Sequence, residues 1–266
     1  MRRTLFASLI LVFLALPAFS QFRTGYSELE DSDMVRTLRS HVTYLSSPEM
    51  EGRAPGSEGE KAAAGYVQSV LESYGIDILS GEEGDIFGIS RESGDTLVSR
   101  NVAGFVPGYD NSLKDRFIVV GARLDNLGTT TLEVDGTPVT QVYAGANGNA
   151  SGLAMMLELA RMVSTNSILF RRPVLFVAFG ASTQGFAGSW YFLNRSLGSK
   201  LKIDAMVNLD MLGSGNSGFF AYTSSNPDMN MIVSQVNSDI QPATPSITAR
   251  ESYPSDHRSF YAKEIP

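Results

Sequence analysis

Runs of apolar residues, separated by polar turns, divide this chain into short strands and amphipathic helices. The run from Phe117 to Val120 is continuous and rich in β-branched residues, which is typical of a strand buried on both faces of a sheet. Further strands are predicted at 76–79, 101–106, 173–179 and 205–212. Apolar residues three or four apart predict helices over 31–45, 58–74, 153–163 and 228–237, and another that carries Trp190.

Turn chemistry completes this pattern. Asp135-Gly136 predicts a hairpin over 132–139, while the acidic, glycine-rich range 81–94 is expected to be a solvated loop. Strands that alternate with helices predict one three-layer α/β/α sandwich around a mostly parallel, mixed sheet. Polar residues follow the central strand at once, namely Arg123, Asp125 and Asn126, and open sheets of this class collect ligands and catalytic groups there.

The first 21 residues have the layout of a secretory signal, with a basic start, an apolar centre and small residues at Ala18 and Ser20. We therefore expect a signal peptide at 1–20 and an exported domain at 21–266, in the periplasm or outside the cell. A retained membrane anchor is the alternative, but the apolar run is short for a membrane span. No later segment is long and apolar enough, so no membrane contact is expected beyond the signal peptide.

Composition narrows the chemistry. A formal net charge of -7 argues against nucleic acid as a partner. The absence of cysteine excludes disulfides, thiolate zinc sites and a cysteine nucleophile. Only two histidines are present: His257, and His41, which lies on a predicted helix and is expected to be a packing or surface residue.

Short motifs follow one another along the chain from about Leu38 to Pro266. They are Leu45-Ser46-Ser47, Glu51-Gly52-Arg53, Pro55-Gly56-Ser57, Asn101-Val102, Pro107-Gly108, Gly145-Ala146, Asn149-Ala150-Ser151-Gly152, Val177-Ala178-Phe179-Gly180-Ala181, Gln184-Gly185, Asn208-Leu209-Asp210-Met211 and Ser255-Asp256-His257. In this order they resemble the dizinc aminopeptidases, metallopeptidase family 28, which also contains glutaminyl cyclases and carboxypeptidases. The resemblance implies a zinc-exopeptidase fold. It also implies that the family's last strand and helix, which would follow Ile265-Pro266, are missing from this sequence.

The resemblance further implies a site with two zinc ions and a glutamate as general base on the metal-bound water. Four of its positions are replaced: a histidine by Arg123, the bridging aspartate by Asn147, the general base by Ser182 and a ligand glutamate by Thr183. Asp210 and His257 keep ligand positions, one for each zinc. Asp125 keeps the place of the carboxylate that orients the missing histidine, and Asp256 is expected beside it behind the ligands.

Elementary ligand chemistry agrees with this loss. Asparagine offers a neutral carbonyl where two dications must be balanced, and a threonine hydroxyl is a weak ligand. The guanidinium of Arg123 only donates and carries a fixed positive charge, so it repels zinc. We therefore expect no cofactor and no catalytic residue. We also expect Arg123 to pair with Asp210 or Asp125 and to balance those carboxylates in place of metal.

Two functional hypotheses follow. The first is a non-catalytic pseudopeptidase that binds a peptide or a protein. The second is an active aminopeptidase whose zinc is held by the substitute ligands Asp125, Asp210, Asp256 and His257. Glutaminyl cyclase activity is disfavoured because its single zinc needs the positions of Asn147 and Thr183. A serine hydrolase set of Ser182, Asp256 and His257 is weaker than a helix-capping role for Ser182, because Gly180-x-Ser182-x-Gln184 lacks the second glycine of a nucleophile elbow.

Overall fold

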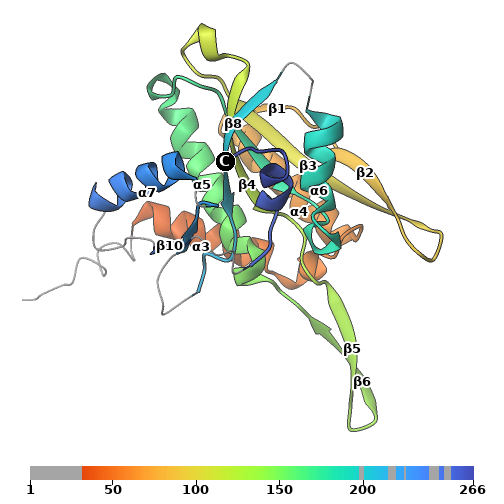
Figure 1. Ribbon diagram of the computed structural model, residues 1–266. Coiled ribbons are helices and arrows are strands. Elements are labelled where there is room, and N and C mark those ends of the chain that lie inside the picture. The colour runs from red at the N-terminus through yellow and green to blue at the C-terminus, as the bar shows by residue number, and fades with distance from the viewer. Residues whose placement is uncertain (1–31, 198–200, 215–219, 225, 240–245, 249–252) are drawn as a thin grey trace, which may run out of the picture. The chain divides into compact units, whose positions relative to one another are not determined.

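The computed structural model describes residues 32–197, 201–214, 220–224, 226–239, 246–248 and 253–266 (Figure 1). Two compact units divide the chain, Met1–Thr37 and Leu38–Pro266, and the account below concerns the second. The predicted signal peptide at 1–20 lies outside the described residues. Within the described ranges, every helix is too short or too polar to cross a membrane.

A mixed sheet forms the centre of the second unit, with the strand order β1-β3-β7-β4-β8 and with β2 paired to β3. Its strands are β1 (Asp77–Ile78), β2 (Asp85–Ser90), β3 (Thr96–Val106), β4 (Arg116–Arg123), β7 (Val174–Phe179) and β8 (Lys202–Leu209). Strand β4 pairs in parallel with β7 and β8, whereas β3 is antiparallel to β1, β2 and β7. Parallel pairing is therefore confined to the β7-β4-β8 end of the described sheet, and the half around β3 is antiparallel.

Helices pack on both faces of the sheet, and the predicted α/β sandwich is confirmed (Figure 1). The helices are α3 (Asp33–Leu45), α4 (Glu58–Ser73), α5 (Ser151–Thr165), α6 (Ala187–Tyr191), α7 (Pro227–Asp239) and α8 (His257–Tyr261). One face buries Val120, Ala122 and Phe176 against α4 and α5. The other buries Val119 and Phe179 against Phe192 and α8. Strand alternation thus supplies apolar side chains to two separate cores.

Two smaller pairs of strands lie outside the central sheet. The predicted hairpin is confirmed as β5 (Thr129–Val134) and β6 (Thr137–Val142), joined by Asp135-Gly136, and it extends away from the sheet (Figure 1). Strands β9 (Phe220–Tyr222) and β10 (Ser246–Thr248) pair in parallel. The hairpin leaves the sheet just after β4, so its base lies close to the polar residues that follow that strand.

The prediction of a solvated loop over the whole of 81–94 is wrong. Residues Asp85–Ser90 form β2, which pairs antiparallel with the first half of a longer β3 than the sequence predicts. Acidic and glycine residues on both sides conceal the short apolar alternation, and Phe87 is buried with its ring stacked on Tyr191. Tertiary packing of that ring outweighs the loop-like composition.

The packing role expected for His41 is confirmed. Its side chain is buried at the end of α3, and Nδ1 lies 2.7 Å from the hydroxyl of Tyr66 on α4. Burial lowers the pKa of His41, which favours the neutral ring.

Short 3-10 or π turns complete the chain at Pro48–Arg53, Asn111–Leu113, Ala146–Ala150, Ser167–Leu169, Ser182–Gln184 and Phe192–Ser196. The turn at Ser182–Gln184 follows the carboxyl end of β7. The turns at Pro48–Arg53 and Ala146–Ala150 are hydrogen-bonded to Leu124, just after β4, and to Leu209, the last residue of β8. These parallel strands end at one edge of the sheet, so the residues that follow them converge there.

Candidate functional site

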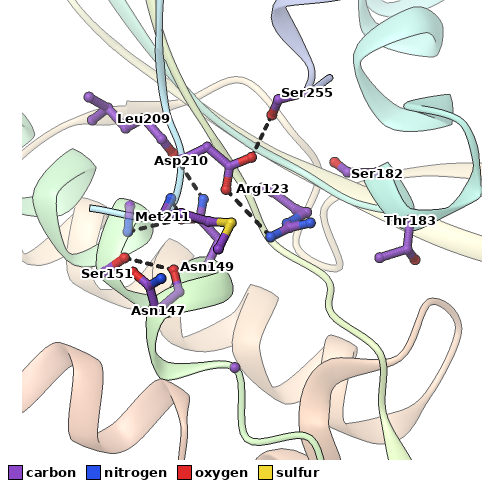
Figure 2. Close-up of polar contacts among 12 residues, drawn as sticks. Arg123, Asn147, Asn149, Ser151, Ser182, Thr183, Leu209, Asp210, Met211 and Ser255 are labelled. Atoms are coloured by element: carbon purple, nitrogen blue, oxygen red, sulfur yellow. Dashed lines mark hydrogen bonds and ion pairs between the residues drawn. The ribbon is translucent and has the colours of Figure 1, made fainter. Parts of the chain in front are cut away.

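An ion pair joins the ends of two neighbouring strands. Arg123 is the last residue of β4, Asp210 follows β8 directly, and Arg123 Nη2 lies 3.4 Å from Asp210 Oδ1 (Figure 2). About one fifth of each side chain is exposed, 20% for Arg123 and 19% for Asp210. The second oxygen of Asp210 accepts a hydrogen bond of 2.8 Å from Ser255, whose hydroxyl in turn accepts one from Asn208. Both carboxylate oxygens of Asp210 are therefore engaged.

Asp125 holds the turn that follows β7. Its side chain is fully buried, and Oδ1 accepts a hydrogen bond of 2.7 Å from the backbone N–H of Ser182. Its Oδ2 accepts bonds from the backbone N–H and the hydroxyl of Thr183, at 2.9 and 2.6 Å. Burial raises the pKa of Asp125, and the bonds from this turn oppose that rise. The carboxylate of Asp125 thus fixes Ser182 and Thr183, the two positions at which the family resemblance implies glutamates.

Ser182 contacts a second buried carboxyl. Its hydroxyl donates to Asp256 Oδ2 at 2.6 Å, and it caps no helix by its side chain, so the capping role expected from the sequence is wrong. Asp256 is fully buried, and burial raises the pKa of Asp256 to about 7. A serine nucleophile needs its hydroxyl to donate to a base that an acid orients, usually an imidazole. Here the hydroxyl donates directly to the carboxyl group of Asp256, without an imidazole between them.

Two asparagines tie the loop before α5 to the segment after β8 (Figure 2). Asn147 Oδ1 accepts a bond of 2.8 Å from the backbone N–H of Gly213. Asn149 accepts from the N–H of Met211 at 2.9 Å and donates to the carbonyl of Leu209 at 2.9 Å. Asn147, at the position where the resemblance implies a bridging aspartate, therefore holds the backbone of Gly213.

His257 begins α8, and its ring meets that of Tyr222 edge to face, with centroids 5.4 Å apart. Both rings line a small cavity of about 40 Å³ together with Met206, Met229 and Phe260. The structure thus brings together Arg123 with Asp210, and Asp125 with Ser182, Thr183 and Asp256. The described ring contact of His257 is with Tyr222 of β9.

Arg53 is a structural residue of this region that the sequence does not reveal. It is fully buried, and its guanidinium donates to the carbonyl oxygens of Leu45, Leu124, Ala144 and Gly145. Burial lowers the pKa of Arg53 to about 10, so it stays charged at neutral pH. One side chain therefore connects the segment after β4 with the loop before α5. The motif Glu51-Gly52-Arg53 is the only sequence feature that draws attention to it.

Glu60 is a second such residue. It lies in the first turn of α4, fully buried, where it accepts bonds from the hydroxyl of Ser99 at 2.6 Å and the N–H of Gly56 at 2.7 Å. Burial raises the pKa of Glu60 to about 7. Its position in a helix that otherwise reads as amphipathic gives no sign of this burial.

Fold and site together define a zinc-exopeptidase-like α/β domain. A profile of Peptidase family M28 matches residues 101–266, and the chain belongs to that family of zinc metallopeptidases. Leupeptin-inactivating enzyme 1 of Streptomyces exfoliatus is 28% identical over 222 residues, which are 82% of this chain and 44% of that protein. The aminopeptidase YwaD of Bacillus subtilis is 28% identical over 134 residues, 48% of this chain and 28% of that protein.

Solved structures show the same fold. The glutaminyl cyclase of Porphyromonas gingivalis superposes with a TM-score of 0.70 at 19% identity, over 87% of this chain and 81% of that one. A Zn-dependent exopeptidase of Parabacteroides distasonis gives 0.66 at 18% identity, with coverage of 87% and 81%. The chain spans less than half of the length of the curated relatives named above.

The side chains at this site do not fit a two-zinc centre. Structural and catalytic zinc takes imidazole, carboxylate and thiolate donors. In the part of the chain that the structure describes, no three His, Asp or Glu side chains are grouped so that they could hold a metal ion. Asp125 and Asp210 accept hydrogen bonds at both oxygens, and the charge of Arg123 opposes a dication beside them.

Proposed function

We propose that this chain is a pseudopeptidase, a non-catalytic member of the family that binds a peptide or a polypeptide segment around Arg123 and Asp210. The observation that carries the proposal is the ion pair between these residues. It puts a fixed guanidinium charge where the family resemblance places a histidine ligand, and it engages a carboxylate that would otherwise serve zinc.

The missing general base supports the same conclusion. Hydrolysis by this class of enzyme needs a group that accepts a proton from water, together with a metal that polarises the scissile carbonyl. Ser182 donates its hydroxyl to Asp256, and Thr183 donates its hydroxyl to Asp125. Neither side chain accepts a proton from water at neutral pH.

Peptide binding follows from what remains of the scaffold. The family is one of peptidases, and relatives are named aminopeptidases. The strands that present the site here, β4 and β8, pair in parallel. Asn147 and Asn149 hold the loop before α5 against the segment after β8, so side-chain hydrogen bonds fix these surroundings. A pre-formed surface of this kind loses little conformational entropy when a ligand binds.

Export is part of the proposal. The basic and apolar start of the sequence supports secretion through a cleaved signal at 1–20, to the periplasm or the extracellular medium. Detection of a mature N-terminus near Gln21 in the exported fraction tests this. Retention of the full chain in the cytoplasm would contradict it.

Zinc content and hydrolysis test the loss of catalysis. The purified chain is exposed to zinc, dialysed and analysed for metal, beside Asp210→Ala and the exposed control Asp228→Ala. Hydrolysis of aminoacyl nitroanilides is measured on the same samples. We expect substoichiometric zinc and no turnover in all three. One or two equivalents of zinc that disappear only in Asp210→Ala, with turnover, would establish the active aminopeptidase with Asp125, Asp210, Asp256 and His257 as ligands.

Binding is measured separately, so that loss of catalysis and peptide recognition are not confused. Tetrapeptides of mixed sequence are titrated calorimetrically into the chain, with the Arg123→Gln variant as the comparison. Saturable binding that the variant weakens is expected. Absence of binding to any peptide would contradict the proposed function even if the chain is catalytically inert.

A further inference from the structure

We infer that Arg123 binds the terminal carboxylate of a peptide, so that this chain recognises the carboxyl end of its ligand. The inference rests on the proposed function, because it names the ligand group that the same residues take. It reverses the polarity of an aminopeptidase, which holds the amino end of its substrate at this place.

The guanidinium of Arg123 has unused hydrogen-bonding capacity. Its one described partner is Asp210, at 3.4 Å, and its Nε is buried without a partner. Other arginines of the chain make shorter ion pairs: Arg116 with Asp204 at 2.6 Å and Arg171 with Asp110 at 2.8 Å. An arginine offers five N–H donors in a planar fork. The described bond to Asp210 uses one of those of Arg123, and because Nε is buried the donors left for a ligand are those of Nη1 and Nη2.

Part of the Arg123 side chain is accessible, since one fifth of it is exposed. The turn that carries Gly148 lies beside its guanidinium, and a Cβ built on residue 148 would lie only 3.2 Å from Arg123 Nη2. A glycine at this position therefore avoids crowding the guanidinium. A ligand can approach Arg123 at its exposed part.

The carboxylates near Arg123 are already engaged in hydrogen bonds. Asp210 is held by Ser255, which fixes the carboxylate at the edge of the guanidinium. Asp125 is fully enclosed, and its oxygens are occupied by the N–H groups of the turn after β7. A buried cation, Arg53, lies close enough to Arg123 for their charges to interact. Arg123 thus lies beside Asp210, which is bonded at both oxygens, and both Arg123 and Arg53 lie near the enclosed Asp125.

A planar monoanion suits this geometry best. A carboxylate can take two parallel hydrogen bonds from a guanidinium, which adds direction to the charge attraction. A dianion such as phosphate is disfavoured beside Asp210 in a chain with a formal net charge of -7. An ammonium group is repelled by Arg123 and finds Asp210 already paired. The ligand end that fits is therefore the carboxyl terminus.

Matched peptides test this inference by calorimetry. N-acetylated tetrapeptides of mixed sequence are compared as free acids and as C-terminal amides, and the free acids are compared with and without the acetyl group. We expect amidation to weaken binding about tenfold or more, which is the cost of losing a charge-assisted bidentate pair. Acetylation should leave the dissociation constant within about twofold, because the amino end makes no ion pair here.

Variants assign the effect to Arg123. Arg123→Gln should remove the preference for the free acid, and Arg123→Lys should keep part of it, because a lysine retains the charge without the fork. Arg116→Gln is the control, because Arg116 lies at the opposite end of the same strand, where it pairs with Asp204. Circular dichroism and thermal melting confirm that each variant is folded, and a folded Arg123→Lys keeps the test valid if Arg123→Gln does not fold.

Each outcome decides between the two proposals. Equal binding of acid and amide would overturn the carboxylate site but leave the peptide-binding function standing. A requirement for the free amino terminus would overturn it as well. Tight binding of acetate or of an N-acetylated amino acid, with no gain from a longer peptide, would support the carboxylate site and contradict the peptide function.

Discussion

Ser182 Oγ lies 2.6 Å from Asp256 Oδ2, so the residue at the general-base position donates a hydrogen bond to a buried carboxylate. Catalysis requires the opposite behaviour at this place, a group that accepts a proton from water. The neighbouring Thr183 is also a donor, to Asp125. The turn after β7 is therefore held by two carboxylates behind it and presents none of its own.

Reintroducing the glutamate alone should harm the fold without creating an enzyme. Ser182→Glu places a third carboxylate beside Asp125 and Asp256 in a buried turn, and we expect a loss of about 2–4 kcal/mol in the free energy of unfolding. Urea denaturation measures the loss, and aminoacyl nitroanilide hydrolysis should stay at background. Gln184→Glu adds the same charge at an exposed position of the same turn and should be nearly neutral. Turnover in Ser182→Glu would show that metal binding had survived.

The ion pair of Arg123 and Asp210 should couple their contributions to stability. We expect Arg123→Met and Asp210→Asn each to cost about 1–3 kcal/mol, and the double variant to cost clearly less than the sum, because neither charge is then left alone. The exposed pair of Arg171 and Asp110, at 2.8 Å, is the control, and its coupling should be below about 1 kcal/mol. Additive losses at Arg123 and Asp210 would show that the pair contributes nothing.

Arg123→His should not restore a zinc centre. The variant supplies one imidazole, but Asn147 and Thr183 still lack the charge and donor strength that a dication needs. Metal analysis after exposure to zinc should give no stoichiometric binding. The triple variant with Asn147→Asp and Thr183→Glu is the positive comparison, and zinc in the single variant would contradict this account.

Loss of Arg53 should loosen the region before the chain unfolds as a whole. Arg53→Met leaves four carbonyl oxygens without their donor, and we expect a cost of about 3–5 kcal/mol. Hydrogen exchange should accelerate first at 124–126 and 144–150, the two segments that Arg53 connects. Arg116→Met removes an exposed arginine of β4 and should not change exchange there. Uniform acceleration throughout the chain would argue for a general core defect.

Stability should fall as the pH rises toward 7. Burial raises the pKa of Glu60 to about 7, from an ordinary value of 4.5, so between these values the folded chain keeps a proton that the unfolded chain has lost. The stability that this proton provides is present below about pH 5 and is lost as the pH reaches 7. The melting temperature should therefore be higher at pH 5.5 than at pH 7.5.

Glu60→Gln should flatten this dependence, because the amide cannot ionise. Glu58→Gln, at an exposed position of the same helix turn, should leave it unchanged. Asp256 acts in the same direction, since burial raises the pKa of Asp256 to about 7 as well, so part of the slope should remain in Glu60→Gln. An unchanged slope in Glu60→Gln would show that Glu60 is ionised in the folded chain.

The elements that sequence patterning predicted are those whose period or turn chemistry is local. A continuous apolar run predicts strand β4, and the two-residue turn Asp135-Gly136 predicts the hairpin. Strand β2 does not, because its register depends on β3 and on the burial of Phe87. Local composition carries no information about that distant partner.

The candidate site divides in the same way. Arg123 and Asp210 follow neighbouring parallel strands, so the order of the motifs already brings them to one edge of the sheet. The burial of Arg53 and Glu60 could not be predicted, because arginine and glutamate are ordinarily exposed and their partners here are mostly backbone groups. Nor does the sequence reveal that Asp125 accepts bonds from two consecutive backbone N–H groups.

The positive charge beside Asp210 belongs to a side chain of the protein, so it does not depend on the supply of a metal ion. A metalloenzyme acquires its counter-charge from outside and loses it to chelators or to competing metal-binding proteins. Arg123 is part of the polypeptide, so every chain carries one such charge. Under the proposed function, a surface organised around Arg123 keeps the same charge in zinc-rich and zinc-poor surroundings, so its ability to bind a ligand depends on folding and not on metal supply.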